Sequence, residues 1–175
     1  ANRPVRLWGY EPYLVETILA TRENPIYLPG ARIQESVQIS NALDSVVAGA
    51  DIIIMATPSH VLRQVLSQMT PLLNAEMTFV SATKGIENQT LMRMSEVIVD
   101  VLGFNPRVAV LSGPTFAAEV AADEPTALVV ASLNEELRLY LQNALSAPRF
   151  RLYTNSDVVG VEIGAAVKNI IAIAA

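Results

Sequence analysis

The sequence predicts an α/β fold with a doubly wound parallel sheet, and three observations lead to that prediction. Apolar runs alternate along the chain with amphipathic segments of helical spacing, and the connections between them are short. The run at 51–56 is apolar without alternation, as expected for a strand covered on both faces. The 175 residues are 51% hydrophobic, which is enough for one well-buried domain and part of a second.

The expected elements follow one another from strand to helix along the chain. Strands are expected at 5–8, 37–39, 51–56, 77–81, 108–111, 127–131 and 150–153. Helices are expected from Pro12, at 42–48, after Ser59, and at 91–102, 116–120, 135–145 and 157–175. Pro12 favours the first helical position, and Asn41 is expected to cap the second helix. Residues 24–30, with two prolines and a glycine, indicate an irregular surface loop.

The stretch at 108–120, VAVLSGPTFAAEV, is the centre of this pattern, because a buried strand ends there and a helix begins. In a parallel sheet such a junction lies at the carboxyl edge of the strands, where ligands bind and free amide groups face an anion. Gly113 lets the backbone come close to a ligand, and Thr115 offers a hydroxyl that caps the helix or binds a substrate. The alternative is an ordinary strand-to-helix turn.

Two lysines favour the ligand-binding interpretation. Lys84 follows the strand at 77–81, at the same edge of the sheet, although lysines in such turns are often simply solvated. Lys168 continues a four-residue spacing of small residues with Gly160, Gly164 and Ala172, so that it either snorkels to solvent or performs a task. Desolvation and a second cation both lower the pKa of an ammonium group, which makes a lysine usable as a general acid or base.

The composition excludes several other classes of function. With 12 basic and 17 acidic residues, the net charge of −5 gives no general attraction to nucleic acid or to an anionic membrane. The sequence has no cysteine, and its one histidine, His60, rules out a multi-histidine metal centre, so no metal is expected. Apolar runs are too short for a membrane span. A soluble protein in the reducing cytoplasm fits these features.

Both ends of the chain suggest that the sequence is part of a larger protein. None of the eight glycines forms G-x-G, the phosphate-binding turn that opens a dinucleotide-binding fold. The segment at 157–175 is apolar nearly all round, as expected for a helix inside a larger structure. We therefore expect a domain at 1–155 that is incomplete at its amino end, and the start of a second domain at 156–175.

Five stretches in register resemble the bacterial NAD(P)-dependent glycerol-3-phosphate dehydrogenases. They are LWGYEP at 7–12, TRENPIYLPG at 21–30, ATKGIE at 82–87, LSGPTFAAEVA at 111–121 and GVEIGAAVKNIIAIAA at 160–175. The resemblance implies a Rossmann-like NAD(P)-binding domain without its first strand and glycine-rich turn, followed by the first helix of an all-α substrate domain. It also implies an enzyme, homodimeric when intact, that reduces dihydroxyacetone phosphate to sn-glycerol 3-phosphate for glycerophospholipid synthesis.

The resemblance assigns roles to individual residues. It implies that Lys168 is the catalytic proton donor and acceptor, with Asn169 beside it at the substrate. It implies that Lys84 contacts both substrate and cofactor. The remaining residues so implied are Gly113 and Thr115 at the substrate, and Tyr10 and Ala117 at NAD or NADP. Relatives that favour NADPH often carry a basic residue at the position of Tyr10.

Two alternatives remain open from the sequence. The chain could belong to a dehydrogenase of another small hydroxy acid, or it could be a non-catalytic nucleotide-binding fragment. Without the pyrophosphate-binding turn, the 175 residues alone are expected not to turn over.

Overall fold

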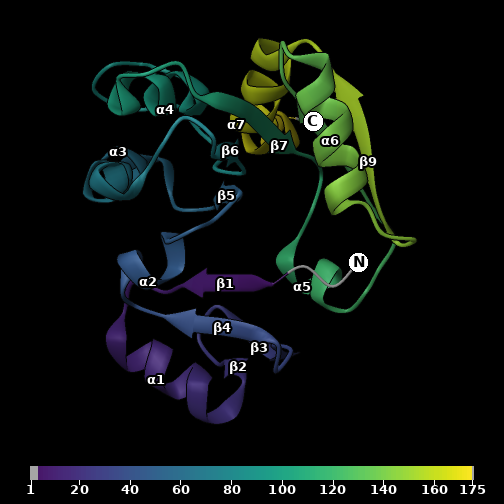
Figure 1. Cartoon of the computed structure of the whole chain (residues 1–175). Helices are drawn as coiled ribbons and strands as arrows, with labels where there is room; N and C mark the ends of the chain where they lie inside the picture. The colour runs from purple at the N-terminus through teal and green to yellow at the C-terminus, as the bar shows by residue number, and fades with distance from the viewer. Residues whose placement is uncertain (1–3, 175) are drawn as a thin grey trace.

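The computed structural model describes residues 4–174, apart from the side chains of residues 169, 171 and 172. Its strands are β1 Val5–Trp8, β2 Glu23–Asn24, β3 Leu28–Arg32, β4 Val37–Ser40, β5 Ile52–Met55, β6 Thr78–Ser81, β7 Arg107–Ser112, β8 Thr126–Ala131 and β9 Phe150–Asn155. Its helices are α1 Pro12–Thr21, α2 Leu43–Val47, α3 Ser59–Met69, the 3₁₀ turn η1 Thr70–Leu72, α4 Met94–Leu102, α5 Ala117–Ala121, α6 Glu135–Leu145 and α7 Val158–Ala174. The predicted α/β class is confirmed (Figure 1).

The main sheet has five strands in the order β5-β6-β7-β8-β9. All neighbours are parallel except β7 and β8, which run antiparallel. A parallel return needs a long crossover, usually a helix that covers the sheet. The only helix between β7 and β8 is the five-residue α5, and it packs against β3 instead. The expectation of an all-parallel sheet therefore fails at this pair.

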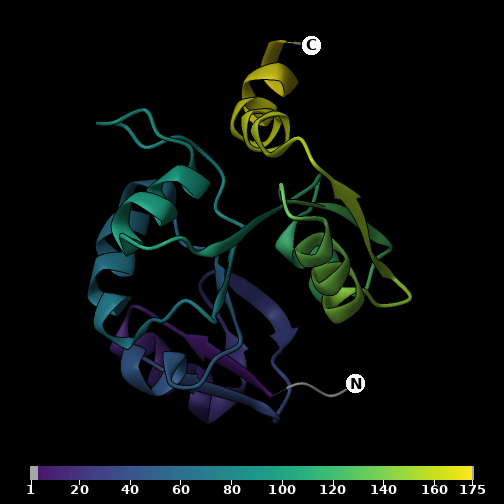
Figure 2. The same cartoon turned by 45° about the horizontal axis from the view of Figure 1, so that its top comes forward.

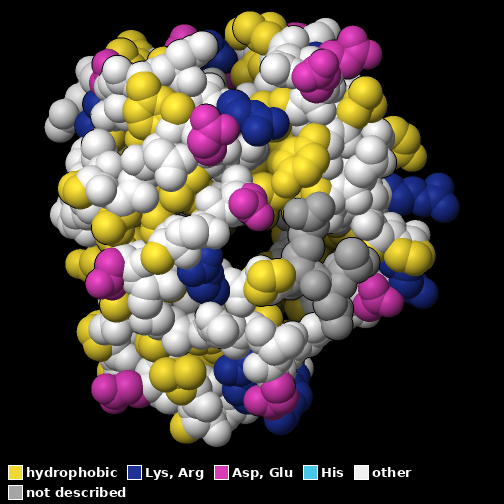
Figure 3. Space-filling view, in the orientation of Figure 1, with side chains coloured by type: hydrophobic (Ala, Val, Ile, Leu, Met, Phe, Trp, Pro, Cys, Tyr) yellow, Lys and Arg dark blue, Asp and Glu magenta, His cyan; other side chains and the backbone are white. Residues whose placement is uncertain are grey.

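The sheet is also divided. β1 pairs in parallel with β4 in a separate two-stranded sheet, which carries α1 and lies apart from the main sheet in both cartoon views (Figures 1 and 2). The space-filling view is hollowed between the two parts (Figure 3). Leu7 on β1 and Ile54 on β5 are 40% and 47% exposed. The expectation that the strand at 51–56 is covered on both faces is therefore wrong at Ile54.

Helices cover both faces of the five-stranded sheet. On one face, α3 and α4 pack against β5 and β6 around the fully buried Phe79. On the other face, Leu137 and Leu141 of α6 pack against Val80 of β6 and Val130 of β8. The three layers hold the carboxyl ends of β6 and β7 in place, and these ends carry the candidate site.

The segment predicted as a surface loop at 24–30 forms part of an antiparallel hairpin. Strands β2 and β3 pair there, and the Glu23 carboxylate accepts a hydrogen bond of 2.6 Å from the Gly30 amide. Arg22 ends α1 in the left-handed region, with φ of 59°, and so turns the chain into β2. The hairpin depends on the Glu23 hydrogen bond and on the left-handed backbone of Arg22, neither of which can be predicted from the proline and glycine content of the segment.

Two helices begin at residues other than those predicted from the sequence. Helix α2 begins at Leu43 with Ala42 in the cap position, while the Asn41 carbonyl accepts a hydrogen bond of 3.0 Å from the Trp8 indole. Helix α4 begins at Met94 and not at 91, because Leu91 lies in the left-handed region, with φ of 57°. The predicted cap at Asn41 is therefore wrong, and the residues before α4 belong to the loop that follows β6.

Candidate active site

The register of two strands brings the predicted site residues together. Ser81 of β6 pairs with Val110 of β7, so Lys84 and Gly113, each three residues further on, emerge side by side at the carboxyl edge. The Lys84 Nζ donates a hydrogen bond of 3.2 Å to the Gly113 carbonyl. Helix α7 brings Lys168 to the same place from a distant part of the chain. The two lysines therefore line one hollow. The sequence predicted Lys84 at this edge of the sheet with Gly113 and Thr115, and it left the surroundings of Lys168 open.

The two ammonium groups border one hollow of about 310 Å³. Its lining residues are Lys84, Gly85, Thr115, Phe116, Ala165, Ala166 and Lys168. The Lys168 Nζ lies 4.5 Å from the centroid of the Phe116 ring, a cation–π contact that holds the ammonium without neutralising it. Among the ion pairs of the described residues, none involves either lysine.

The hollow gathers positive charge in an acidic chain. Lys84 and Lys168 are the only two lysines in the sequence, whose net charge is −5. Burial lowers the pKa of the Lys84 ammonium below its ordinary value, and the positive charge of Lys168 lowers it further. Two unneutralised cations and a threonine at a strand edge have the chemistry to attract an anionic group and to exchange a proton with it.

The pKa of Lys84 gives a direct test of this proximity. Replacing Lys168 by alanine is expected to raise that pKa, because one of the two causes that lower it is removed. The value should stay below that of an ordinary lysine, since burial remains. ¹³C-lysine labelling of the chain gives two Cε signals whose pH titrations report the pKa of each side chain. An unchanged Lys84 titration would show that the two charges do not interact.

Position 113 requires glycine for a different reason from the one that the sequence suggested. A Cβ there would lie 2.8 Å from the carbonyl oxygen of Ala127 and 3.1 Å from the Cα of Leu128. Close packing against β8 therefore requires the glycine, and the close approach is to a strand rather than to a ligand. Gly85 is the residue in the hollow that needs an unusual backbone, with φ of 128°.

The other predicted residues lie around this hollow in different ways. Thr115 lines it but does not cap α5, whose cap position is Phe116 without a side-chain hydrogen bond. Ala117 is the first residue of α5. The side chain of Asn169 lies outside the described part of the structure. Tyr10 follows β1 in the other sheet, where it is 76% exposed and makes an edge contact with Trp8.

Sequence reasoning missed two features of the site. Phe116, in the stretch already singled out, lies under Lys168, and its aromatic ring beside a glycine-proline turn was a usable signal. Glu162, which carried no prediction, accepts hydrogen bonds from the amide and the hydroxyl of Ser95 in α4. A lone carboxylate in an apolar helix was the available signal, because a buried acid needs specific partners.

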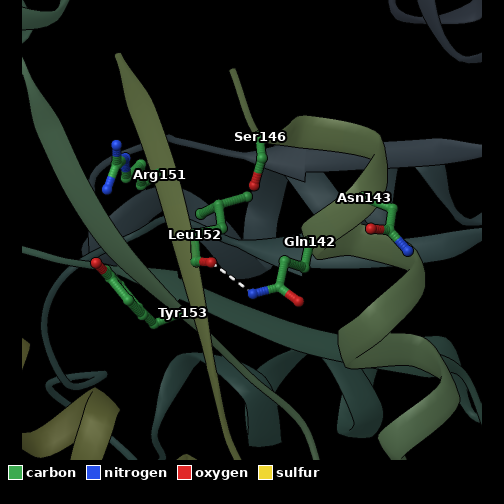
Figure 4. A pocket seen from close by; sticks show the side chains of 6 residues that line it. All are labelled: Gln142, Asn143, Ser146, Arg151, Leu152 and Tyr153. Atoms are coloured by element: carbon green, nitrogen blue, oxygen red, sulfur yellow. Dashed lines mark hydrogen bonds between the residues drawn. The ribbon is translucent and has the colours of Figure 1, made fainter. Parts of the chain in front are cut away.

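A second hollow of about 370 Å³ lies between α6 and β9 (Figure 4). The Gln142 side chain there donates a hydrogen bond of 2.6 Å to the Leu152 carbonyl, which covers an edge strand. Arg151 and Tyr153 lie on the far side of β9 from Asn143 (Figure 4). No charged groups converge in this hollow, so it is not the candidate site.

Two kinds of feature are absent from the described residues. Within residues 4–174, no cluster of three or more histidine or carboxylate side chains could hold a metal ion. In the same part of the chain, none of the helices has the length and hydrophobicity that crossing a membrane requires.

The fold places the chain in the class of Rossmann-like α/β proteins. Residues 1–138 match the family model described as NAD-dependent glycerol-3-phosphate dehydrogenase N-terminus. The chain therefore belongs to the NAD-dependent glycerol-3-phosphate dehydrogenase family, and the resemblance found in the sequence is confirmed.

Similar proteins agree with this family. Two relatives named glycerol-3-phosphate dehydrogenase (NAD(P)+), from Koribacter versatilis and Geobacter metallireducens, are 51% and 50% identical over 173 residues, or 98% of this chain. A solved glycerol-3-phosphate dehydrogenase from Coxiella burnetii is 38% identical with a TM-score of 0.90, and the match covers 97% of this chain and 52% of that one. The chain spans about half the length of the curated relatives it matches, 51% and 52% of them.

Proposed function

We propose that this chain forms the cofactor-binding half, and part of the substrate site, of an NAD(P)-dependent glycerol-3-phosphate dehydrogenase. The enzyme transfers a hydride from NADH or NADPH to dihydroxyacetone phosphate and yields sn-glycerol 3-phosphate. The observation that carries this proposal is the convergence of Lys84 and Lys168 on one hollow at the strand edge. The name of the family, NAD-dependent glycerol-3-phosphate dehydrogenase, supports the choice of substrate and cofactor.

The side chains of the hollow have separate tasks in this reaction. Charge develops on the carbonyl oxygen of the substrate when its carbon is reduced, and the Lys168 ammonium stabilises that charge and donates the proton. In the reverse direction the neutral Lys168 amine accepts the proton of the alcohol. Lys84 holds the anionic substrate, and Gly113 and Thr115 orient it at the strand edge. Asn169 is proposed to assist Lys168 at the substrate.

The described residues fit one end of the cofactor. The Lys84 ammonium, beside the threonine and the backbone of the turn at 82–85, suits a polar carboxamide or a phosphate-bearing ligand at the carboxyl edge of β6. We propose that Lys84 and Ala117 contact the nicotinamide end and that Tyr10 contacts the adenosine end. The cofactor supplies the hydride when it is bound.

Cofactor preference is a separate prediction. Tyr10 offers an aromatic face without a charge for a 2′-phosphate, and the Glu11 carboxylate accepts a hydrogen bond of 2.9 Å from the Tyr27 hydroxyl. Neither residue therefore selects strongly between NADH and NADPH, and we expect kcat/KM values within about tenfold of each other, or about 1.4 kcal/mol. Steady-state kinetics of the complete enzyme with both cofactors test this. A hundredfold preference would contradict the assigned role of this turn.

The proposal extends to the domain organisation, oligomeric state and location of the whole protein. We propose that residues 1–155 belong to the cofactor domain and that 156–175 begin a helical substrate domain. The exposed Ile170 and Ile173 on α7 support a further apolar covering for that helix. The intact enzyme is proposed to be a cytoplasmic homodimer that supplies glycerophospholipid synthesis, and the 175 residues alone are proposed to be inactive.

A substrate screen of the complete enzyme tests the function. Dihydroxyacetone phosphate should be reduced, whereas dihydroxyacetone and small 2-oxo acids should not be, because they lack the phosphate group that the lysines are proposed to hold. Reduction of a 2-oxo acid in preference to the phosphorylated ketone would favour the second candidate, a hydroxy-acid dehydrogenase. Binding of cofactor without any turnover would favour a non-catalytic nucleotide-binding protein.

A further inference from the structure

A buried carboxylate lies on α7, six residues before Lys168. The Glu162 side chain is 5% exposed. Its oxygens accept hydrogen bonds from the Ser95 amide at 2.8 Å, the Ser95 hydroxyl at 2.6 Å and the Arg93 guanidinium at 2.6 Å. Burying a carboxylate is costly unless charge-assisted hydrogen bonds replace its water, and three such donors are in place here.

The donors belong to the part of the chain that carries Lys84. Ser95 lies in the first turn of α4, where amide groups are free and the helix dipole favours a negative charge. Arg93 forms an isolated β-bridge with Ile86 and so closes the loop that begins just after Lys84. Glu162 therefore joins the loop of Lys84 to the helix of Lys168, across 67 residues of sequence.

The bonds of Glu162 hold together two elements whose lysines repel each other. The Lys168 charge disfavours protonation of Lys84, so the two ammonium groups repel each other across the hollow. Lys84 bonds the Gly113 carbonyl, and Lys168 lies over the Phe116 ring. Neither contact neutralises a positive charge. A buried ion pair contributes little net stability compared with an apolar contact, but removing one partner is strongly destabilising, because it leaves the other charge buried and unpaired.

We propose that Glu162 is the positioning residue of this site, and that its bonds to Ser95 and Arg93 hold the Lys84 loop and the Lys168 helix at the separation that the reaction needs. The assignment of a reaction to the two lysines rests on the proposed function. The positioning itself concerns only the described side chains, and its test needs neither substrate nor cofactor.

The test compares Glu162→Gln with Glu96→Gln in the ¹³C-lysine-labelled chain. Glu96 is the matched control, because its carboxylate also pairs with Arg93, at 2.7 Å, and accepts a hydrogen bond from the Arg93 amide, whereas none of its hydrogen bonds among the described residues reaches α7. Loss of positioning should let α7 move away, so the pKa of Lys84 should rise in Glu162→Gln, and it should stay at the wild-type value in Glu96→Gln. Thermal unfolding is recorded beside each titration.

The sign of the change separates positioning from other effects. Removal of a negative charge acting directly on the lysines would lower their pKa, and a purely structural role would lower Tm while leaving the Lys84 titration unchanged. Either result would overturn the proposal, as would an equal rise in Glu96→Gln. Ser95→Ala removes one donor without changing any charge, and it should raise the Lys84 pKa by a smaller amount. That variant keeps the proposal testable if Glu162→Gln does not fold.

Discussion

Replacing Lys168 by alanine in the complete enzyme is expected to lower kcat by about a hundredfold or more, the usual scale for a lost general acid. Cofactor binding should stay nearly normal, because the hollow places Lys168 beside the substrate end of the site in our proposal. Steady-state and single-turnover kinetics with dihydroxyacetone phosphate measure the change. If the variant keeps most of its kcat in a folded enzyme, another group or a bound water donates the proton.

Lys168→Arg is the matched control. Arginine keeps a cation over the Phe116 ring but does not release a proton near neutral pH, so it should restore substrate binding without restoring kcat. Loss of the fold is the competing explanation for the alanine variant. It should be minor, because alanine favours a helix more than lysine does and only a cation–π contact of about 1 kcal/mol is lost. We expect Tm to fall by a few degrees only.

Lys84→Ala is expected to act mainly on substrate binding. Loss of a hydrogen bond to a charged group costs about 1.5–3 kcal/mol, so KM for dihydroxyacetone phosphate should rise roughly tenfold to a hundredfold. Lys84 is exposed and bonds only one backbone carbonyl among the described residues, so Tm should change little. Initial-rate kinetics over a range of substrate concentrations give both constants.

An exposed cation away from the hollow serves as the control for Lys84. Arg151 on β9 lines the other hollow, and Arg151→Ala should leave KM for the substrate unchanged. A similar rise of KM in both variants would mean that the net charge of the protein, and not a contact in the site, governs substrate binding. A kcat effect in Lys84→Ala as large as that in Lys168→Ala would reverse the assigned roles.

Local patterns predicted the elements whose ends are set locally. Helix α6 runs from Glu135 to Leu145 as expected, and the Asn134 side chain caps it by accepting a hydrogen bond of 3.0 Å from the Leu137 amide. Strand β5 and helix α3 were likewise visible from their apolar spacing. The two helices satisfy their backbone groups with residues close in sequence, which is why periodicity and capping residues were sufficient for them. Strand β5 was visible from its continuous apolar run, although its backbone pairs with β6, 26 residues further on.

Features that depend on distant partners could not be predicted in this way. The antiparallel pairing of β7 and β8 goes with a connection that holds only the five-residue α5. The need for glycine at 113 comes from the Ala127 carbonyl on the neighbouring strand. The exposure of Ile54 reflects the divided sheet. Most clearly, the Glu162 carboxylate finds its donors 67 residues earlier in the chain. A single sequence shows that such a residue is unusual, but it does not show what the residue contacts.

A short amine-specific cross-linker tests most directly whether Lys84 and Lys168 face one site. Lys84 and Lys168 are the only lysines in the sequence, so besides the N-terminal amine no other amine of the folded chain competes. The expected result is an intramolecular bridge between the peptides that contain these two residues, found by mass spectrometry in monomeric, folded protein. Peptides modified separately at Lys84 and Lys168, with no bridge between them, would contradict the claim.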